Sequence, residues 1–172
     1  MICPTCGYDN LPGSEHCAGC LHDLTALDRP IAIDRIDRSL MEDPVGILCP
    51  RTPIALAPGA TLQEAIQAML DANIGAVLVV DDEGNLLGIL SERDLLTKEA
   101  GLVPDYAGRK VAEFMTRTPE VVQTHDCLAF ALHKMDTGGY RHLPVVMEGK
   151  PVGVVSVRDM LRHVTKLCKA KS

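Results

Sequence analysis

The stretch Gly88-Ile-Leu-Ser91-Glu-Arg93-Asp94-Leu-Leu96 returns later in the chain as Gly153-Val-Val-Ser156-Val-Arg158-Asp159-Met-Leu161. Each copy predicts a short apolar strand, then a serine, then the first turn of a helix. The first amide groups of a helix have no partner within the helix, so backbone N–H groups at this corner point outward, where an anion can bind. The two copies predict either two such sites or one duplicated structural element.

The duplication extends well beyond this stretch. Arg51-Thr52-Pro53 aligns with Arg117-Thr118-Pro119 at an offset of 66 residues, whereas the two stretches quoted above align at an offset of 65. The lost residue falls in a turn, at 81–85 in the first copy, and surface turns tolerate such deletions. The chain from residue 45 onward therefore predicts two copies of one unit.

Each unit has the pattern of a β-α-β-β-α fold, in the α/β (α+β) class. In the first unit a helix begins near Thr61, which with Glu64 has the spacing of a capping box, and strands follow at 76–80 and 86–90. The second unit has Cys127 in place of Thr61, so its helix needs another cap, and Asp126 is the candidate.

One such unit has little with which to cover its sheet, so two units should dock on each other. We therefore expect a pseudo-twofold pair spanning 45–164, with a cleft on each side of the axis. The repeats are predicted at 45–101 and 108–165.

Four cysteines near the N-terminus have the spacing of a metal site. Cys3 and Cys6 form one CxxC pair, and Cys17 and Cys20 form a second. Two such loops can close a tetrahedron of thiolates around Zn²⁺, which then supplies folding energy to a segment too short for its own core. Residues 1–22 therefore predict a structural zinc ribbon, with iron or a redox-active dithiol as the alternatives.

Residues beside the cysteines refine this prediction. Gly7 and Gly19 are expected to allow the positive φ angles that such loops use. His16 and His22 lie beside the second pair, but four cysteines suffice as ligands, so we interpret both histidines as surface residues.

The segment 23–44 predicts a linker that contains one helix. Ile33, Ile36 and Leu40 fall on one face of that helix. We expect this face to pack on the next domain or on a partner.

Composition limits the classes of function. The chain has 172 residues, of which 47% are hydrophobic, and its net charge of −6 argues against a general nucleic-acid-binding surface. It opens on the cysteine pair instead of a signal peptide, and no apolar run approaches the roughly 18 residues of a membrane span. Seven cysteines, an odd number, with four in metal spacing, favour reduced thiols and a cytoplasmic protein.

Residues 45–164 resemble the tandem cystathionine β-synthase-type (CBS) domain pair, or Bateman module. The resemblance rests on the Thr-Pro entry, the Leu-Pro-Val-Val strand at 143–146 and the ending Gly-h-h-Ser-x-x-Asp in both copies, where h is an apolar residue. It implies a non-catalytic regulatory module that binds an adenine nucleotide (AMP, ADP, ATP or S-adenosylmethionine) in clefts between the repeats. It also implies a homodimer.

The resemblance suggests roles for residues of both copies. Asp94 or Asp159 would accept hydrogen bonds from ribose hydroxyls, and Ser91 or Ser156 would meet a phosphate at the start of its helix. The basic side chains expected to neutralise phosphate charge are Arg93, Arg141, His142 and Arg158. The residues expected to wall the adenine are Thr52, Ile54, Ala76, Thr118, Val121 and Leu143.

The two predicted clefts cannot be equivalent, because the first copy has Gly75 where the second has Arg141. We expect the cleft with Arg141 and His142 to capture the phosphate. The spacing Ser-x-x-Asp is also that of a helix capping box, so a purely structural interpretation of the corner stays open.

Three classes of function are therefore weighed. The first is nucleotide sensing, and the second is a non-catalytic dimeric scaffold whose zinc ribbon docks a protein or, with less support, a nucleic acid. An enzyme has the least support, because the sequence shows no Ser-His-Asp arrangement, open metal site or Gly-rich phosphate loop.

Overall fold

The computed structural model divides the chain into two compact units, Met1–Asp34 and Arg35–Ser172. It describes residues 1–11, 13–25, 32–97 and 105–169. Among these residues, no helix combines the length and the apolar character that crossing a bilayer requires.

The N-terminal unit folds around its cysteines. Among the described residues of this unit, the buried apolar side chains are Cys3, Cys17 and Leu24. Two loops are each closed by one antiparallel bridge, between Ile2 and Asp9 and between His16 and Asp23. So small an apolar cluster cannot stabilise a unit of this size unaided.

The first repeat of the larger unit has the order strand, helix, strand, strand, helix. β1 (Ala55–Leu56) runs parallel to β2 (Ala76–Val80), which pairs antiparallel with β3 (Leu86–Ser91). α2 (Leu62–Ala72) connects β1 to β2, and α3 (Glu92–Thr97) follows β3.

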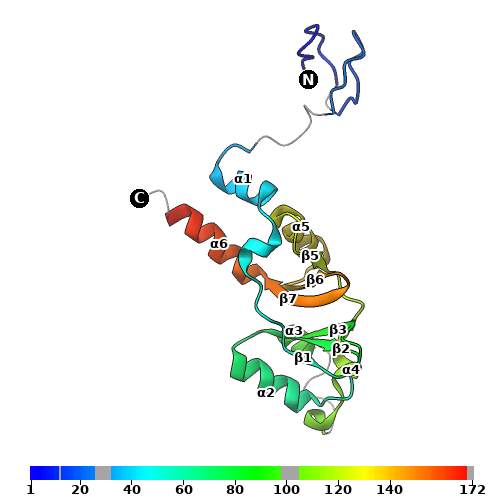
Figure 1. Cartoon of the computed structure of the whole chain (residues 1–172), viewed down its shortest axis with the longest axis vertical. Coiled ribbons are helices and arrows are strands. Elements are labelled where there is room, and N and C mark those ends of the chain that lie inside the picture. The colour runs from blue at the N-terminus through cyan, green and yellow to red at the C-terminus, as the bar shows by residue number, and fades with distance from the viewer. Residues whose placement is uncertain (12, 26–31, 98–104, 170–172) are drawn as a thin grey trace. The chain divides into compact units, whose positions relative to one another are not determined.

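The second repeat has the same order. β5 (Val122–Gln123) runs parallel to β6 (His142–Met147), which pairs antiparallel with β7 (Lys150–Ser156). α5 (Leu128–Gly138) connects β5 to β6, and α6 (Val157–Lys169) follows β7. The predicted β-α-β-β-α order of both copies is therefore confirmed (Figure 1).

The helices α2 and α5 begin differently, as the sequence predicted. The prediction that Asp126 caps α5 is wrong. The capping box at Thr61 is present. Asp126 does not cap α5, because its carboxylate accepts the amide of Gln123 at 2.7 Å. The first amide of α5, that of Leu128, instead donates to the carbonyl of Asp43 at 3.0 Å, in the segment that precedes the first repeat.

The segments that lead into the two repeats are exchanged between them. α4 (Val111–Phe114) and β4 (Thr116–Arg117) precede the second repeat, but α4 packs in the core of the first and β4 pairs with β3. The 3-10 helix η1 (Val45–Leu48) precedes the first repeat, but Val45 is fully buried in the core of the second.

Backbone hydrogen bonds fix this exchange symmetrically. The amide of Val45 donates to the carbonyl of Asp126 at 2.7 Å, and 66 residues apart the amide of Val111 donates to the carbonyl of Ala60 at 2.9 Å. The bond from Leu128 to Asp43 likewise has its counterpart in the amide of Leu62, which donates to the carbonyl of Arg109 at 2.8 Å. The pseudo-twofold relation therefore holds atom for atom at the start of each repeat.

The exchange explains the glycine that opens the repeated stretch. A Cβ atom added to Gly153 would lie 2.5 Å from the Cβ of Pro50, in the segment that crosses over from the first repeat. At Gly88 an added Cβ would lie 2.6 Å from the sulfur of Met115 and 2.8 Å from the carbonyl oxygen of Thr116. Only glycine lets the crossing segment approach the strand this closely.

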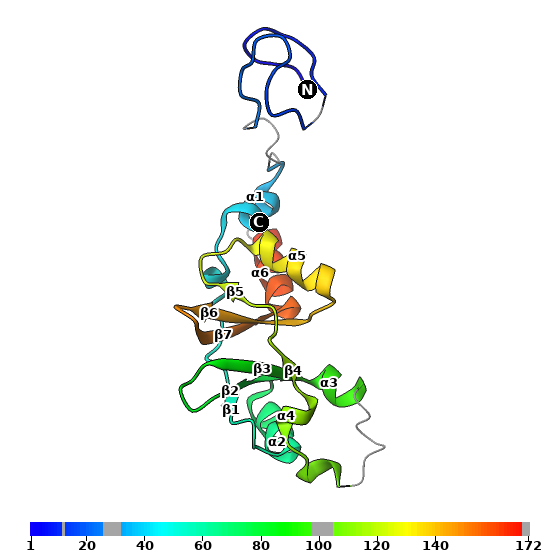
Figure 2. The same cartoon turned by 90° about the vertical axis from the view of Figure 1, so that its right-hand side faces the viewer.

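The two sheets face each other, and the long helices cover their outer sides (Figure 2). Val154 of β7 packs against Ala76, Leu78 and Ile89 of the first sheet. The alternate residues of β2, Val77 and Val79, are fully buried under α2 and α4. A strand covered on both faces needs an unbroken apolar run, which Ala76–Val80 provides.

The linker helix α1 (Arg35–Glu42) packs on α5 and α6 of the second repeat, so it covers this domain. Leu40 contacts the core there, whereas Ile33 precedes the helix and is 91% exposed. Ser39 is buried, donates its hydroxyl proton to Asp43, and lies 2.7 Å from Nε2 of His163. Because its one proton is used, Ser39 must accept from Nε2–H of His163.

We predict that Gly153→Ala destabilises the protein by about 1–3 kcal/mol, because the added methyl group overpacks the contact with Pro50. Urea unfolding followed by circular dichroism measures the loss. Gly59→Ala is the control, since an added Cβ there meets nothing within 4 Å. Equal stabilities for the two variants would show that the approach at Gly153 is not tight.

Candidate functional site

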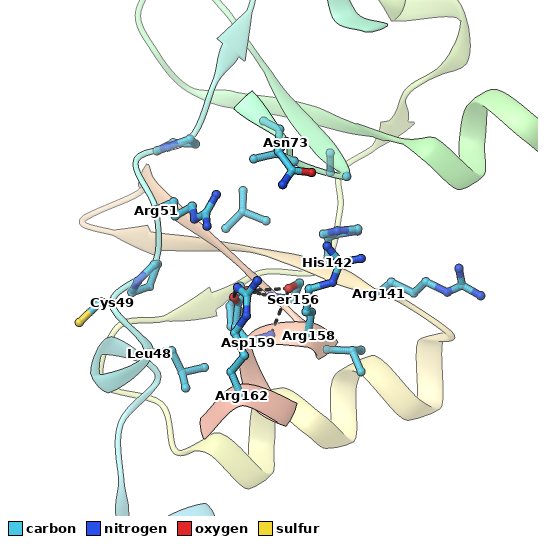
Figure 3. Close-up of a pocket in the computed structure, with 18 of the residues that line it drawn as sticks. Leu48, Cys49, Arg51, Asn73, Arg141, His142, Ser156, Arg158, Asp159 and Arg162 are labelled. Atoms are coloured by element: carbon cyan, nitrogen blue, oxygen red, sulfur yellow. Dashed lines mark hydrogen bonds and ion pairs between the residues drawn. The ribbon is translucent and has the colours of Figure 1, made fainter. Parts of the chain in front are cut away.

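The larger of two described cavities is a cleft of about 690 Å³ that both repeats line, here called the Asp159 cleft. Its lining residues are 47–54, 73–76, Glu92, Arg141, His142, 154–159, Arg162, His163 and Lys166. They come from the segment that crosses over from the first repeat, the start of β2, the end of β7 and the first turns of α6 (Figure 3).

The corner between β7 and α6 forms a reciprocal cap. Oδ2 of Asp159 accepts the hydroxyl of Ser156 at 2.6 Å and its amide at 2.9 Å, and the amide of Asp159 donates to the Ser156 hydroxyl at 3.3 Å. Ser91 and Asp94 make the same three bonds at the same distances. The structural role foreseen for the Ser-x-x-Asp spacing is therefore present in both copies.

The two aspartates differ in their second carboxylate oxygen. Oδ1 of Asp94 accepts the hydroxyl of Thr116 at 3.1 Å, in the crossing segment. The residue equivalent to Thr116 is Pro50, which has no hydroxyl. Oδ1 of Asp159 instead accepts a hydrogen bond from the guanidinium of Arg162 at 3.2 Å. The side chain of Asp159 is 32% exposed. Asp159 thus keeps an acceptor oxygen within reach of a ligand.

Positive charge dominates the Asp159 cleft. Five of its lining residues are arginine or lysine and two are carboxylates, in a chain whose net charge is −6. Among the residues that the structure describes, the side chains of Arg51, Arg158 and Lys166 have no ion-pair or hydrogen-bond partner. Arg51 points into the cleft, whereas Arg141 extends away from it (Figure 3). The cleft is therefore suited to an anion.

His142 is a partly buried titratable group at the end of the cleft that also holds Glu92. Burial lowers the pKa of His142, against the opposing influence of Glu92, so the ring is neutral near pH 7. A Cβ added to Gly75 would lie 2.9 Å from Nε2 of His142 and 3.3 Å from a carboxylate oxygen of Glu92. Glycine at 75 therefore makes room for the histidine and glutamate at this end of the cleft.

The structure brings eight of the fourteen proposed ligand-binding residues together in the Asp159 cleft. These are Thr52, Ile54, Ala76, Arg141, His142, Ser156, Arg158 and Asp159. Thr118 and Val121 line the second cavity, of about 410 Å³. The other four, Ser91, Arg93, Asp94 and Leu143, line neither cavity.

All four have structural roles: Ser91 and Asp94 form the cap described above, and Leu143 and Arg93 act elsewhere. Leu143 is 1% exposed in the core of the second repeat, where its strand is covered by helices. Arg93 donates to the carbonyl of Gly139 at 3.1 Å, and so ties α3 to the end of α5.

Sequence reasoning missed basic residues on α6 and in the crossing segment. Arg162, His163 and Lys166 follow Asp159 at three, four and seven residues, which places them on one helical face. That spacing was visible in the sequence. Arg51 had no comparable signal, because nothing in the sequence shows that its segment crosses to the other repeat.

Ser39, Asp43 and His163 meet behind the cleft but do not form the arrangement of a serine hydrolase. The carboxylate of Asp43 accepts a hydrogen bond from the hydroxyl of Ser39 instead of orienting the histidine. Nε2 of His163 already carries a proton toward Ser39, so it cannot take the serine's proton. This cluster anchors α1.

The four N-terminal cysteines form a second candidate site. Their sulfur atoms all lie within 4.8 Å of one another, with 3.6 Å between Cys3 and Cys20 and 3.5 Å between Cys6 and Cys17. Tetrahedral Zn–S bonds of about 2.3 Å would place sulfurs about 3.8 Å apart. These residues can therefore hold a metal ion, and the exposed His16 and His22 are not part of the cluster.

The two cysteine loops repeat each other at an offset of 14 residues. Gly7 donates to the carbonyl of Cys3 at 2.9 Å, and Leu21 donates to that of Cys17 at 2.8 Å. Gly7 and Leu21 both have positive φ, of 74° and 59°. The expectation that Gly19 supplies positive φ is wrong, because Leu21 takes that conformation in the second loop.

Gly19 packs closely against Tyr8 instead, since an added Cβ would lie 3.2 Å from the Cβ and Cγ of Tyr8 and displace that side chain slightly. Asn10 is buried, at 6% exposure. Its amide lies 3.6 Å from the sulfur of Cys17 and its oxygen accepts the amide of Ala18 at 2.9 Å. Burial opposes the ionisation of Cys17, but hydrogen bonds from Gly19, Cys20 and Asn10 outweigh it and lower the pKa of Cys17 to about 6. A thiolate there is the form that binds metal.

Comparison with known proteins gives one family. The family model described as "CBS domain" matches residues 41–101 and again 111–166. A 17.7 kDa protein of Acidianus ambivalens is 33% identical over 106 residues, which are 61% of this chain and 63% of that protein. The chain therefore spans less than two thirds of that relative's length.

Solved structures agree with this match. A CBS-domain containing protein of Agrobacterium tumefaciens is 28% identical, with a TM-score of 0.64, over 70% of this chain and 95% of that one. CBSX2, solved in complex with AMP, is 26% identical, with a TM-score of 0.61, over 72% of this chain and 97% of that one.

We predict that acid destabilises the protein through His142. The pKa of His142 is lowered in the folded state, so below its unfolded value of about 6.5 the unfolded chain binds more protons, and stability falls as the pH falls. Urea unfolding at pH 7.5 and 5.5 should therefore show a smaller loss for His142→Gln than for the wild type. The exposed His125, changed to Gln, is the control. A loss in His142→Gln as large as in the wild type would contradict the prediction.

Proposed function

The chain belongs to the CBS-domain family, as a tandem pair, and from this premise we propose that it is a non-catalytic regulatory protein whose Asp159 cleft binds an adenine nucleotide. The repeats are taken as 45–101 and 108–165. CBSX2, whose solved structure contains AMP, supports the choice of ligand. The cleft volume of about 690 Å³ lies within the range of about 300–1,000 Å³ usual for small-molecule sites.

The observation that carries this proposal is the acceptor oxygen of Asp159. A carboxylate only accepts hydrogen bonds, so Oδ1, with Arg162 as its one described partner, can receive a ribose hydroxyl. The adenine then lies against Ile54 and Ala76, at the end of the cleft that the first repeat provides. Asp94, which accepts from Thr116, offers a less accessible counterpart.

The regulatory part of the proposal rests on how the cleft is built. Both repeats line it, so a ligand contacts both and favours whichever arrangement of the two it fits better. We propose further that the pair self-associates as a homodimer. A non-catalytic dimeric scaffold with an empty cleft is the alternative, favoured by the exposed apolar side chains of the N-terminal unit, among them Ile2, Leu11 and Leu21.

We propose that the metal of the N-terminal unit is zinc, in a structural role. Four thiolates without an oxygen or nitrogen ligand favour zinc or an iron–sulfur centre, and a site closed by four protein ligands leaves no position for a reacting water. The metal would provide the folding energy that the small apolar cluster of this unit lacks.

We predict that Asp159→Asn weakens binding of the adenine nucleotide about tenfold or more, because a hydrogen bond to a charged group is worth about 1.5–3 kcal/mol. Isothermal titration with AMP, ADP, ATP and S-adenosylmethionine measures this directly. Asp94→Asn is the matched control, since it loses the same cap in the other repeat. No binding of any adenine compound to metal-replete wild type would leave the empty scaffold as the function.

We predict one zinc ion per chain by elemental mass spectrometry. Removal of zinc by a chelator should collapse the dispersed amide resonances of the N-terminal unit and leave those of 35–169 in place, because the two are separate compact units. Cys17→Ser should behave as the chelated protein does, and the exposed Cys49→Ser should not. Stoichiometric iron, or a unit that stays ordered without metal, would refute the zinc assignment.

A further inference from the structure

The two ends of the Asp159 cleft differ in charge and polarity. One end holds Ile54, Ile74 and Ala76, beside His142 and Glu92. The other end lies between the crossing segment at 47–51 and α6, which pack against each other. At the first end Glu92 opposes a phosphate and His142 is neutral near pH 7, so Arg158 is the cation near this histidine that could attract one, since Arg141 extends away from the cleft. A ligand with both apolar and anionic parts therefore has one favoured direction in the cleft.

The second end is basic along one face of α6. Arg162, His163 and Lys166 all line the cleft on the same face as Asp159. Lys166 lies seven residues beyond Asp159, which is about 10 Å along a helix. The basic face is therefore longer than a ligand ending at a single phosphate beside Asp159 would use.

Charge compensation points the same way. Without Arg141, which extends away from the cleft, the remaining arginines and lysine exceed Glu92 and Asp159 by two positive charges. Asp43 contacts His163 from behind and is not among the lining residues. A phosphate monoester carries about −1.5 to −2 charges at pH 7, so one phosphate could balance this sum, but beside Asp159 it would not reach Lys166, about 10 Å further along the helix. Further phosphates would lie on these cations, whereas the cationic S-adenosylmethionine would add to the surplus.

We propose that the ligand is a nucleoside di- or triphosphate, and that its terminal phosphates lie on Arg162 and Lys166 of α6 with Arg51 opposite. The inference rests on the proposed function, because it takes Asp159 as the ribose acceptor and the Ile54 end as the place of the base. It assigns Arg51 and Lys166 the task of distinguishing a polyphosphate from a monophosphate, by ionic contacts that a monophosphate does not reach. Both side chains lack a described partner that would compete for them.

The test is isothermal titration of the full chain with AMP, ADP, ATP and S-adenosylmethionine, at fixed salt and without magnesium, which would mask phosphate charge. We expect ADP or ATP to bind the wild type about tenfold or more tightly than AMP. Lys166→Met should lower the affinity for ATP about tenfold and leave that for AMP within about twofold. Arg51→Met should act in the same way.

Lys169→Met is the matched control, because Lys169 lies on the same helix but does not line the cleft. It should leave both affinities unchanged. Equal affinities of the wild type for AMP and ATP, tighter binding of S-adenosylmethionine, or an equal loss of AMP and ATP binding in Lys166→Met would overturn the inference and leave the nucleotide-binding proposal standing. Absence of binding to every adenine compound would instead overturn the proposed function itself.

Discussion

The architecture depends on backbone hydrogen bonds that each repeat makes with the segment leading into the other. Val45 pairs with Asp126 and Val111 with Ala60, so neither core is complete without residues that precede the opposite copy. The contact is close enough to require glycine at 88 and 153, where an added Cβ would meet the crossing chain. Packing of this density tolerates few alternatives, so the two repeats stabilise each other as one structure.

The same exchange makes the two corners chemically unequal. Both keep an identical serine–aspartate cap, but the crossing segment meets one aspartate with Thr116 and the other with Pro50. A threonine supplies a hydroxyl that occupies the second carboxylate oxygen, and a proline supplies none. A duplicated fold thus acquires one accessible acceptor through a substitution outside the duplicated corner itself.

The repeat, the order of helices and strands and the cysteine cluster could be predicted because each depends on the spacing of residues that are close together in the sequence or recur at a fixed offset. β2 and β3 begin where the apolar pattern predicted, and Thr61 caps its helix. The exchange of the entry segments between the repeats could not be predicted, because the hydrophobic pattern of such a segment is the same whichever repeat it packs against. For the same reason Arg51 was missed. Leu21 was missed because a leucine at positive φ contradicts local preference and is held there by the bridges and bonds of the loop.

The position of His163 gives the cleft a physical connection to the segment that precedes the domain. His163 lines the cleft, and its Nε2–H donates to Ser39 of α1, the helix that begins at Arg35 where the larger unit begins. Any molecule that draws this ring inward must lengthen the bond to Ser39 and loosen the anchor of α1. A single imidazole therefore joins the lining of the cleft to the helix with which the larger unit begins.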